Sequence, residues 1–144
     1  MIIPPVLSGT NFNLNPQKGS VPFFSGQQTQ TMGVNGNILA PTLLLNQGDT
    51  VVFNVSNNLG EPTTIHWHGM HVSPQNDGGP HTVNEHGATW SPVIPVLDWA
   101  STYRYHPHLH HKTHEHVQKG IAGFIIVKDP IEQALNLPKT YGVD

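Results

Sequence analysis

The sequence predicts an all-β fold, a Greek-key β-sandwich in a single domain. Its 144 residues include 14 glycines and 13 prolines, only 10% are charged, and long runs of helix-forming residues are missing. This composition favours strands joined by turns. Roughly seven to nine short apolar segments with turn signals between them favour a sandwich of Greek-key type.

The first half of the chain predicts four strands. The earliest is an edge strand followed by a loop, because the nearby prolines suit a sheet edge. The second precedes a turn signal at Asn35-Gly36-Asn37. The last two are apolar and flank Gln47-Gly48-Asp49, which predicts that they pair as a buried hairpin. The four predicted strands span 10–16, 28–33, 42–45 and 50–55.

The second half predicts four more strands and a tail. In the first of these strands Ile65 and Trp67 alternate with polar residues, so one face is core and the other carries two histidines. We assign residues 1–128 to the domain and 129–144 to a tail with a helical turn at 131–137. The four strands span 63–68, 89–94, 102–108 and 121–127.

Charge and cysteine content exclude several functions. The formal net charge is −3 and basic runs are absent, so we expect neither nucleic acid nor an anionic membrane as a partner. No stretch resembles a signal peptide or a membrane span. Cysteine is absent, which excludes disulfides, thiolate zinc sites, catalytic cysteines and a mononuclear blue-copper centre.

Histidine is the unusual residue, with 11 copies that crowd into 66–86 and 106–116. In both His66-Trp67-His68 and His106-Pro107-His108, two histidines flank one residue, and a β-strand places both on the same face. Arg104 shares the face of the second pair. Two such pairs on neighbouring strands would bring together four nitrogen ligands of the kind that suits copper and zinc. The alternative is that these are solvent-facing strand residues without a metal.

These motifs resemble the first cupredoxin domain of multicopper oxidases, of the bacterial laccase-like and copper-efflux type. The resemblance implies a cupredoxin-like fold and makes the tail similar to the linker to a second domain. It covers nearly the whole chain, and its matching segments are Ile65-His66-Trp67-His68-Gly69, Asp77-Gly78-Gly79-Pro80, residues 105–110 and 120–127, and, upstream, residues 34–36 and 47–51.

The resemblance also implies a site. In that family the first domain contributes half of the ligands of a trinuclear copper cluster that reduces dioxygen to water. By position, His66 resembles a type 2 copper ligand. His68 and His106 resemble type 3 ligands that share one copper, and His108 resembles a ligand of the other. Asp77 matches a carboxylate that orients water and relays protons; the alternative is an ordinary turn aspartate before two glycines.

The chain also departs from the family. It lacks the His-Cys-His segment that connects a type 1 copper to the cluster. Arg104 stands where tryptophan is common, and His86 stands where proline is usual. Because a cation beside the cluster would oppose Cu²⁺, we expect Arg104 to face a subunit contact or a carboxylate.

The remaining histidines allow two interpretations. If the connection 109–119 is helical, His110 and His114, or His111 and Glu115, share a face. Together with His116, the first pair either forms a second, adventitious copper or zinc site or belongs to a solvated connection. The loop histidines His71, His81 and His86 are weaker ligand candidates, and Met32 and Met70 are expected to fill the core.

Four imidazoles cannot close three coordination spheres, so we expect another surface to complete the site. A symmetric homo-oligomer would supply it, with a trimer favoured over a dimer and dioxygen as the implied ligand. Three functions follow: a copper-binding half-site, laccase-like oxygen reduction by the assembled oligomer, or a structural or engineered cupredoxin oligomer with no specific metal chemistry. Zinc is an alternative metal in vitro, although copper is favoured at imidazole ligands. The family is typically periplasmic or secreted.

Overall fold

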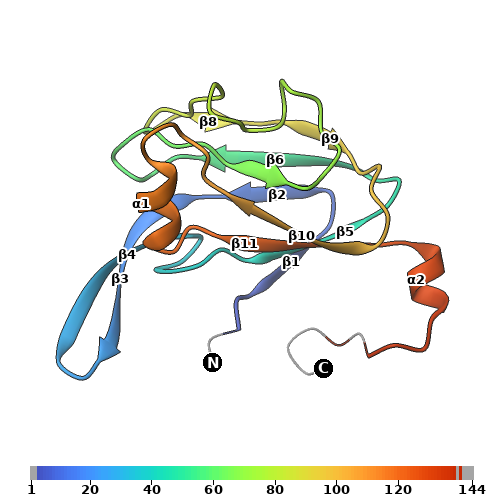
Figure 1. The fold of residues 1–144 in the computed structure, drawn as a ribbon, viewed down its shortest axis with the longest axis horizontal. Helices are drawn as coiled ribbons and strands as arrows, with labels where there is room; N and C mark the ends of the chain where they lie inside the picture. Colours follow the sequence, from blue (N-terminus) through green and yellow to red (C-terminus); the bar gives the residue numbers. More distant parts are fainter. Residues whose placement is uncertain (1–2, 139, 141–144) are drawn as a thin grey trace.

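The computed structural model describes residues 3–138 and 140, and its chain folds into two packed sheets with a projecting hairpin (Figure 1). The first sheet has five strands, in the order β1 (Val6–Ser8), β5 (Thr42–Asn46), β11 (Gly123–Lys128), β10 (Ser101–His106) and β7 (His66–His68). In the second sheet a central strand pairs with three others; these are β6 (Thr50–Ser56) with β2 (Asn11–Leu14), β8 (Thr89–Trp90) and β9 (Val93–Pro95).

The remaining elements lie at the two ends of the sandwich. The hairpin of β3 (Pro16–Phe24) and β4 (Gln27–Val34) projects beside the short helix α1 (Thr113–Gln118), and helix α2 (Pro130–Ala134) lies at the far end (Figure 1). None of the helices in the described part of the chain is long and apolar enough to cross a membrane. The predicted all-β sandwich is therefore confirmed, with two small helices added.

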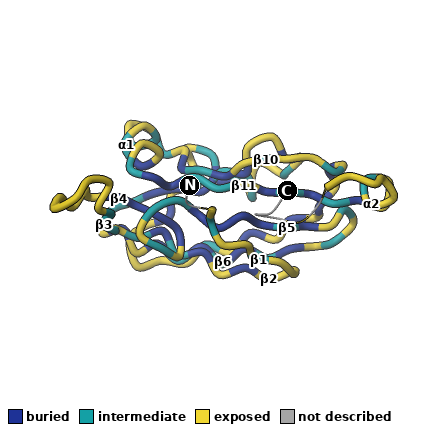
Figure 2. Tube along the Cα trace, turned by 90° about the horizontal axis from the view of Figure 1, so that it is seen from below, coloured by how far each residue is buried: buried dark blue, intermediate teal, exposed yellow. Residues whose placement is uncertain are grey.

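The core lies between the two sheets, where the buried segments of the chain face one another (Figure 2). Its centre is an aromatic stack in which the ring of Trp67 lies 4.2 Å from that of Phe53 and 5.9 Å from that of Tyr105. Trp67 is fully buried and is the residue between His66 and His68. Because side chains alternate along a strand, burial of the Trp67 ring turns both neighbouring histidines away from the core.

The predicted pairing of two apolar strands as a hairpin is wrong. β5 pairs in parallel with β1 and β11, whereas β6 is central in the other sheet. The turn at 47–49 carries the chain across the sandwich: Gln47 donates to the Lys128 carbonyl on one side, and Gly48 donates to the Val96 carbonyl on the other. Both strands are apolar because each is buried in its own sheet, and a shared apolar character does not reveal which strands pair.

Other boundaries also differ from the prediction. The loop expected after the first strand is the long strand β3, whose sequence lacks the alternation that marks a half-buried strand. The segment 89–94 divides at Pro92 into β8 and β9, because proline has no N–H to donate. The strand predicted at 63–68 is regular only from His66 to His68.

Candidate metal centre

The pairing of β7 with β10 brings the two histidine motifs together. In this antiparallel ladder His106 lies opposite His66, Tyr105 opposite Trp67 and Arg104 opposite His68. Directly opposed side chains share a face of the sheet, so the imidazoles lie on the outer face and the two aromatic residues on the core face. The predicted alternation is therefore present in the structure.

His108 joins the cluster although it lies beyond the end of β10. Its backbone N–H donates to the Thr64 hydroxyl, which is fully buried, over 2.6 Å. This bond ties the chain after β10 to the chain before β7. The His108 ring consequently lies 5.2 Å from the ring of His66 and 6.1 Å from that of His106.

The four rings form one group. The centroid of His66 lies 5.6 Å from that of His68 and 5.6 Å from that of His106, and the His68 and His106 centroids are 5.3 Å apart. His66 is partly buried, with 18% of its side chain exposed, while His68 and His108 are exposed. The donors are thus held by the sheet and face solvent on one side.

Backbone carbonyls orient two of the imidazoles. Nδ1 of His66 lies 2.9 Å from the carbonyl oxygen of Asp77, and Nδ1 of His106 lies 2.8 Å from that of Pro107. A carbonyl only accepts, so each Nδ1 carries the hydrogen and each Nε2 keeps its lone pair. This is the second hydrogen bond that orients a histidine for a metal.

Asp77 lies against His66, because its loop is packed tightly on β7. Its carboxylate Oδ1 is 3.2 Å from His66 Nδ1, and its carbonyl also accepts from the Trp67 N–H over 3.4 Å. At Gly78, where φ is +67°, a Cβ atom would lie 1.7 Å from the Ile65 carbonyl oxygen, so only glycine permits this approach. The proton-relay role of Asp77 stays a prediction.

Local environment favours the neutral form of two of these imidazoles. Desolvation lowers the pKa of His68, and the nearby Arg104 guanidinium lowers it further. Burial likewise lowers the pKa of His106, against the raising effect of its bond to the Pro107 carbonyl. Neutral imidazole is the form that binds metals, so neither ring has to lose a proton before it binds a metal near neutral pH.

The donor set fits copper or zinc but does not enclose an ion. Nδ1 of His68 lies 3.1 Å from Nε2 of His106. Two nitrogens at this separation can both bind one metal ion with bonds of about 2 Å. Among residues 3–138 and 140, however, no three side chains of the ligand types gather closely enough to hold a metal ion. The geometry is that of an incomplete site.

The structure does not bring the other predicted ligands together. α1 begins at Thr113, so the shared helical face expected for His110 and His114 does not form. The ring of His110 instead lies 3.9 Å from that of His111, tilted by 56°, in the preceding turn. His114 is exposed, whereas His116 is fully buried on the opposite side of α1.

The loop histidines have other partners, and the two methionines lie in the core. His71 Nδ1 lies 2.6 Å from the buried carboxylate of Asp98, and His86 Nδ1 accepts from the Gly60 N–H over 3.1 Å. His81 is exposed. Met32 and Met70 are both buried, as predicted.

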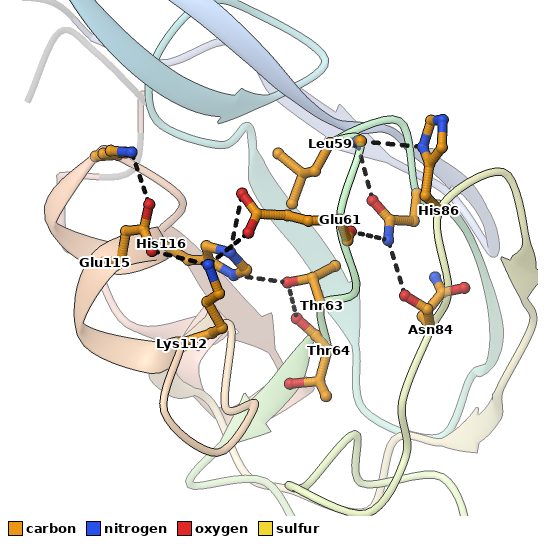
Figure 3. Close-up of polar contacts among 12 residues, drawn as sticks. Leu59, Glu61, Thr63, Thr64, Asn84, His86, Lys112, Glu115 and His116 are labelled. Atoms are coloured by element: carbon orange, nitrogen blue, oxygen red, sulfur yellow. Dashed lines mark hydrogen bonds and ion pairs between the residues drawn. The ribbon is translucent and has the colours of Figure 1, made fainter.

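Sequence reasoning missed a polar network around the buried His116, between α1 and the chain leading into β7 (Figure 3). Nδ1 of His116 lies 3.1 Å from the Thr63 hydroxyl, and Lys112 pairs with Glu61 at 2.6 Å. Glu115 on α1 pairs with both Lys112 and Lys119. We call this group of residues the α1 network. Glu115 is spaced at i, i+3 from Lys112 and at i, i+4 from Lys119, which is the one local signal that could have indicated part of the network.

The expectation that Arg104 faces a subunit contact stays a prediction. The other expectation, that it faces a carboxylate, is wrong for the described chain, in which Arg104 contacts an imidazole. Its Nη2 atom lies 3.1 Å from Nε2 of His68. The reason is the register of the ladder, which sets Arg104 directly opposite His68 on the outer face.

Comparison with known proteins gives consistent relatives. A family profile described as multicopper oxidase matches residues 15–132. The chain is 39% identical to the multicopper oxidase mco of Staphylococcus aureus over 92% of this chain and 29% of that protein. It is also 37% identical to the cell division protein FtsP of Proteus mirabilis, over 99% of this chain and 31% of the relative.

Solved structures agree in fold. The laccase-like multi-copper oxidase CueO from Ochrobactrum sp. superimposes with a TM-score of 0.95 at 37% identity, covering 100% of this chain and 33% of that one. A laccase from Pediococcus acidilactici superimposes with a TM-score of 0.94 at 33% identity, with the same coverage. The chain therefore spans about a third of the length of these relatives.

Proposed function

Because this chain belongs to the multicopper oxidase family, we propose that it is a copper-binding cupredoxin domain that carries one half of a type 2/type 3 copper site. One observation carries the proposal: four imidazoles lie together on the outer face where β7 meets the end of β10. They belong to His66, His68, His106 and His108.

Each residue would have a defined task. His66 and His106 would bind copper through Nε2, since their Nδ1 atoms are held by carbonyls. His68 would share a copper with His106, which its Nδ1 atom already faces. Asp77 orients His66 and would hold a proton beside the type 2 position. Bound copper would supply the one-electron redox chemistry that the reduction of dioxygen requires.

A second ligand surface would complete the site. The four imidazoles do not close a coordination sphere, so further ligands must come from a second copy of the chain or from another cupredoxin domain. We propose self-association for the isolated chain, because symmetry brings identical ligand faces together. A trimer is favoured over a dimer. Native mass spectrometry would measure subunit number and copper content together; a monomer with and without copper would overturn self-association.

Copper titration tests the site itself. We expect copper to bind and to raise the melting temperature, because a ligand of the folded state stabilises it. A His106→Ala, His108→Ala double variant should lose most of this shift, while the matched control His110→Ala, His114→Ala should keep it. Equal copper binding by both double variants would overturn the assignment. Zinc, measured in parallel, should bind more weakly.

A second candidate function is structural. The relative FtsP bears the name of a cell division protein, so membership of this family does not by itself imply oxidase chemistry. In that case stoichiometric copper would leave the melting temperature unchanged.

Oxygen reduction, if the chain carries it out, would occur in the self-associated form proposed above, in which a second copy completes the copper site. Oxygen uptake with a phenolic substrate, compared between the wild type and the His106→Ala, His108→Ala variant, tests this directly. We expect slow uptake at most, since the chain has no cysteine for a type 1 centre to receive electrons.

A further inference from the structure

We propose that Arg104 competes with copper for His68 and thereby sets how tightly the cluster binds metal. This inference rests on the copper-site function proposed above and adds to it a residue that controls affinity. The contact between the two side chains is built into the sheet, because Arg104 on β10 lies directly opposite His68 on β7.

The direction of the hydrogen bond follows from the chemistry of the donor. Nη2 of Arg104 lies 3.1 Å from Nε2 of His68. A guanidinium has five N–H donors, no acceptor and is always protonated in proteins. Nε2 of His68 must therefore be the acceptor, and its lone pair is occupied by Arg104.

The rest of the chain of hydrogen bonds is then determined. Neutral His68 carries its hydrogen on Nδ1 and donates it to Nε2 of His106, 3.1 Å away. His106 carries its own hydrogen on Nδ1 and donates it to the Pro107 carbonyl over 2.8 Å. From Arg104 to the Pro107 carbonyl, each group donates a hydrogen bond to the next. Both nitrogens of each imidazole therefore have hydrogen-bond partners when no metal is bound.

Whichever nitrogen of His68 binds copper, the hydrogen bond between His68 and Arg104 must break. An ion at Nε2 would displace the guanidinium directly. An ion at Nδ1 would require the hydrogen to move to Nε2, with no net gain or loss of a proton, and that hydrogen would then point at an Arg104 N–H. Nε2 of His106 also becomes available only when His68 stops donating to it. Release of Arg104 therefore frees Nε2 of His68 directly, and it frees Nε2 of His106 once the His68 hydrogen moves from Nδ1 to Nε2.

His66 is independent of this competition. Its Nδ1 atom is held by Asp77 on the other side of the cluster, so its Nε2 lone pair does not depend on Arg104. Of the four proposed ligands, His66 is thus ready to bind, whereas Arg104 restrains His68 and His106.

Arg104 also has room to leave. Its side chain is exposed and borders two hollows in the surface: one of about 470 Å³ lined also by His106, His114 and Val117, and one of about 280 Å³ lined also by His68 and Phe124. Phe124 lies opposite Arg104 in the pairing with β11, and its exposed ring offers a face for a displaced guanidinium. The competition therefore needs no change in the core.

The test is the copper affinity of Arg104→Met, measured with a competing chelator and repeated with Arg104→Gln. We expect both variants to bind Cu²⁺ roughly five- to tenfold more tightly than the wild type, because a hydrogen bond to a charged group and a nearby positive charge are both removed. Lys128→Met is the matched control for net charge, since Lys128 lies at the far end of β11, and it should leave the affinity unchanged.

A second readout needs no metal. In ¹⁵N spectra of the imidazoles, His68 of the metal-free wild type should carry its hydrogen on Nδ1, and Arg104→Met should shift it toward the Nε2 form. Unchanged affinity in both Arg104 variants, or an equal gain in Lys128→Met, would overturn the competition while leaving the copper site in place. If neither the wild type nor Arg104→Met binds copper, the proposed function itself fails, and this inference fails with it.

Discussion

The imidazole cluster on the outer face of the sheet and the α1 network around the buried His116 use the same residue type in opposite ways. Two adjacent threonines show the division: Thr64 accepts from the His108 backbone, whereas Thr63 contacts the His116 ring (Figure 3). His108 is exposed and His116 is fully buried, although both follow β10 within one histidine-rich stretch. The difference teaches that the access of a histidine to solvent depends on the face it occupies, not on how many histidines are nearby.

Removal of the buried ring should have the largest effect on stability. His116→Ala leaves a cavity beneath α1 and removes the contact of the Thr63 hydroxyl with the imidazole, so we expect the free energy of unfolding to fall by about 2–4 kcal/mol. Urea denaturation would measure it. His114 is exposed on the same helix, so the stability of His114→Ala should stay within about 0.5 kcal/mol of the wild type. Equal losses of stability in the two variants would contradict a special role for the buried ring.

Thr64 lies between the imidazole cluster and the α1 network, and its substitution should affect both stability and copper binding. Thr64→Val keeps the shape but removes the acceptor for the His108 N–H, which should cost about 1–3 kcal/mol of stability and weaken copper binding. Thr64→Ser retains the hydroxyl and should restore copper affinity. If Thr64→Val destabilises the fold yet binds copper as tightly as the wild type, Thr64 supports the fold without positioning His108.

Mild acid should weaken the α1 network. Burial lowers the pKa of His116, against the raising effect of Glu61 and Glu115. The unfolded chain, with a histidine pKa near 6.5, then binds more protons than the folded chain. Stability from this group is full above pH 6.5 and declines as the pH falls toward the folded pKa. The free energy of unfolding should depend less steeply on pH in His116→Gln than in the wild type. The profile of the control His114→Gln should match that of the wild type. Parallel profiles for His116→Gln and the wild type would contradict this.

The ion pairs on the surface of α1 should matter least. Bonds from Lys119 and then Lys112 lower the pKa of Glu115 to about 2, so this contribution is present above the ordinary glutamate pKa of 4.5 and is lost as the pH falls through about 2. Because these groups are exposed, Glu115→Gln should lower the melting temperature only slightly. In about 1 M salt, which screens surface charges, the difference should vanish; a difference that persists there would indicate a packing role.

Local patterns alone predicted the outward histidines. Strand alternation places Ile65 and Trp67 in the core and His66 and His68 outside, and the same rule holds for Tyr105 and His106. This succeeded because the period of side chains along a strand is a property of neighbouring residues. The lone turn signal at 47–49 failed to predict pairing, because it does not specify whether a chain returns within one sheet or crosses to the other.

By itself, the sequence determined the sandwich class, the outward histidine pairs and the absence of thiolate chemistry. Only the tertiary structure decided that His116 is buried and that Arg104 contacts His68. The physical reason is the range of the interactions: Arg104 meets His68 through a strand register that joins residues 36 positions apart, and His116 meets Thr63 across 53 positions. No local pattern carries that register, so the contact between Arg104 and His68 emerges only when β7 and β10 pair.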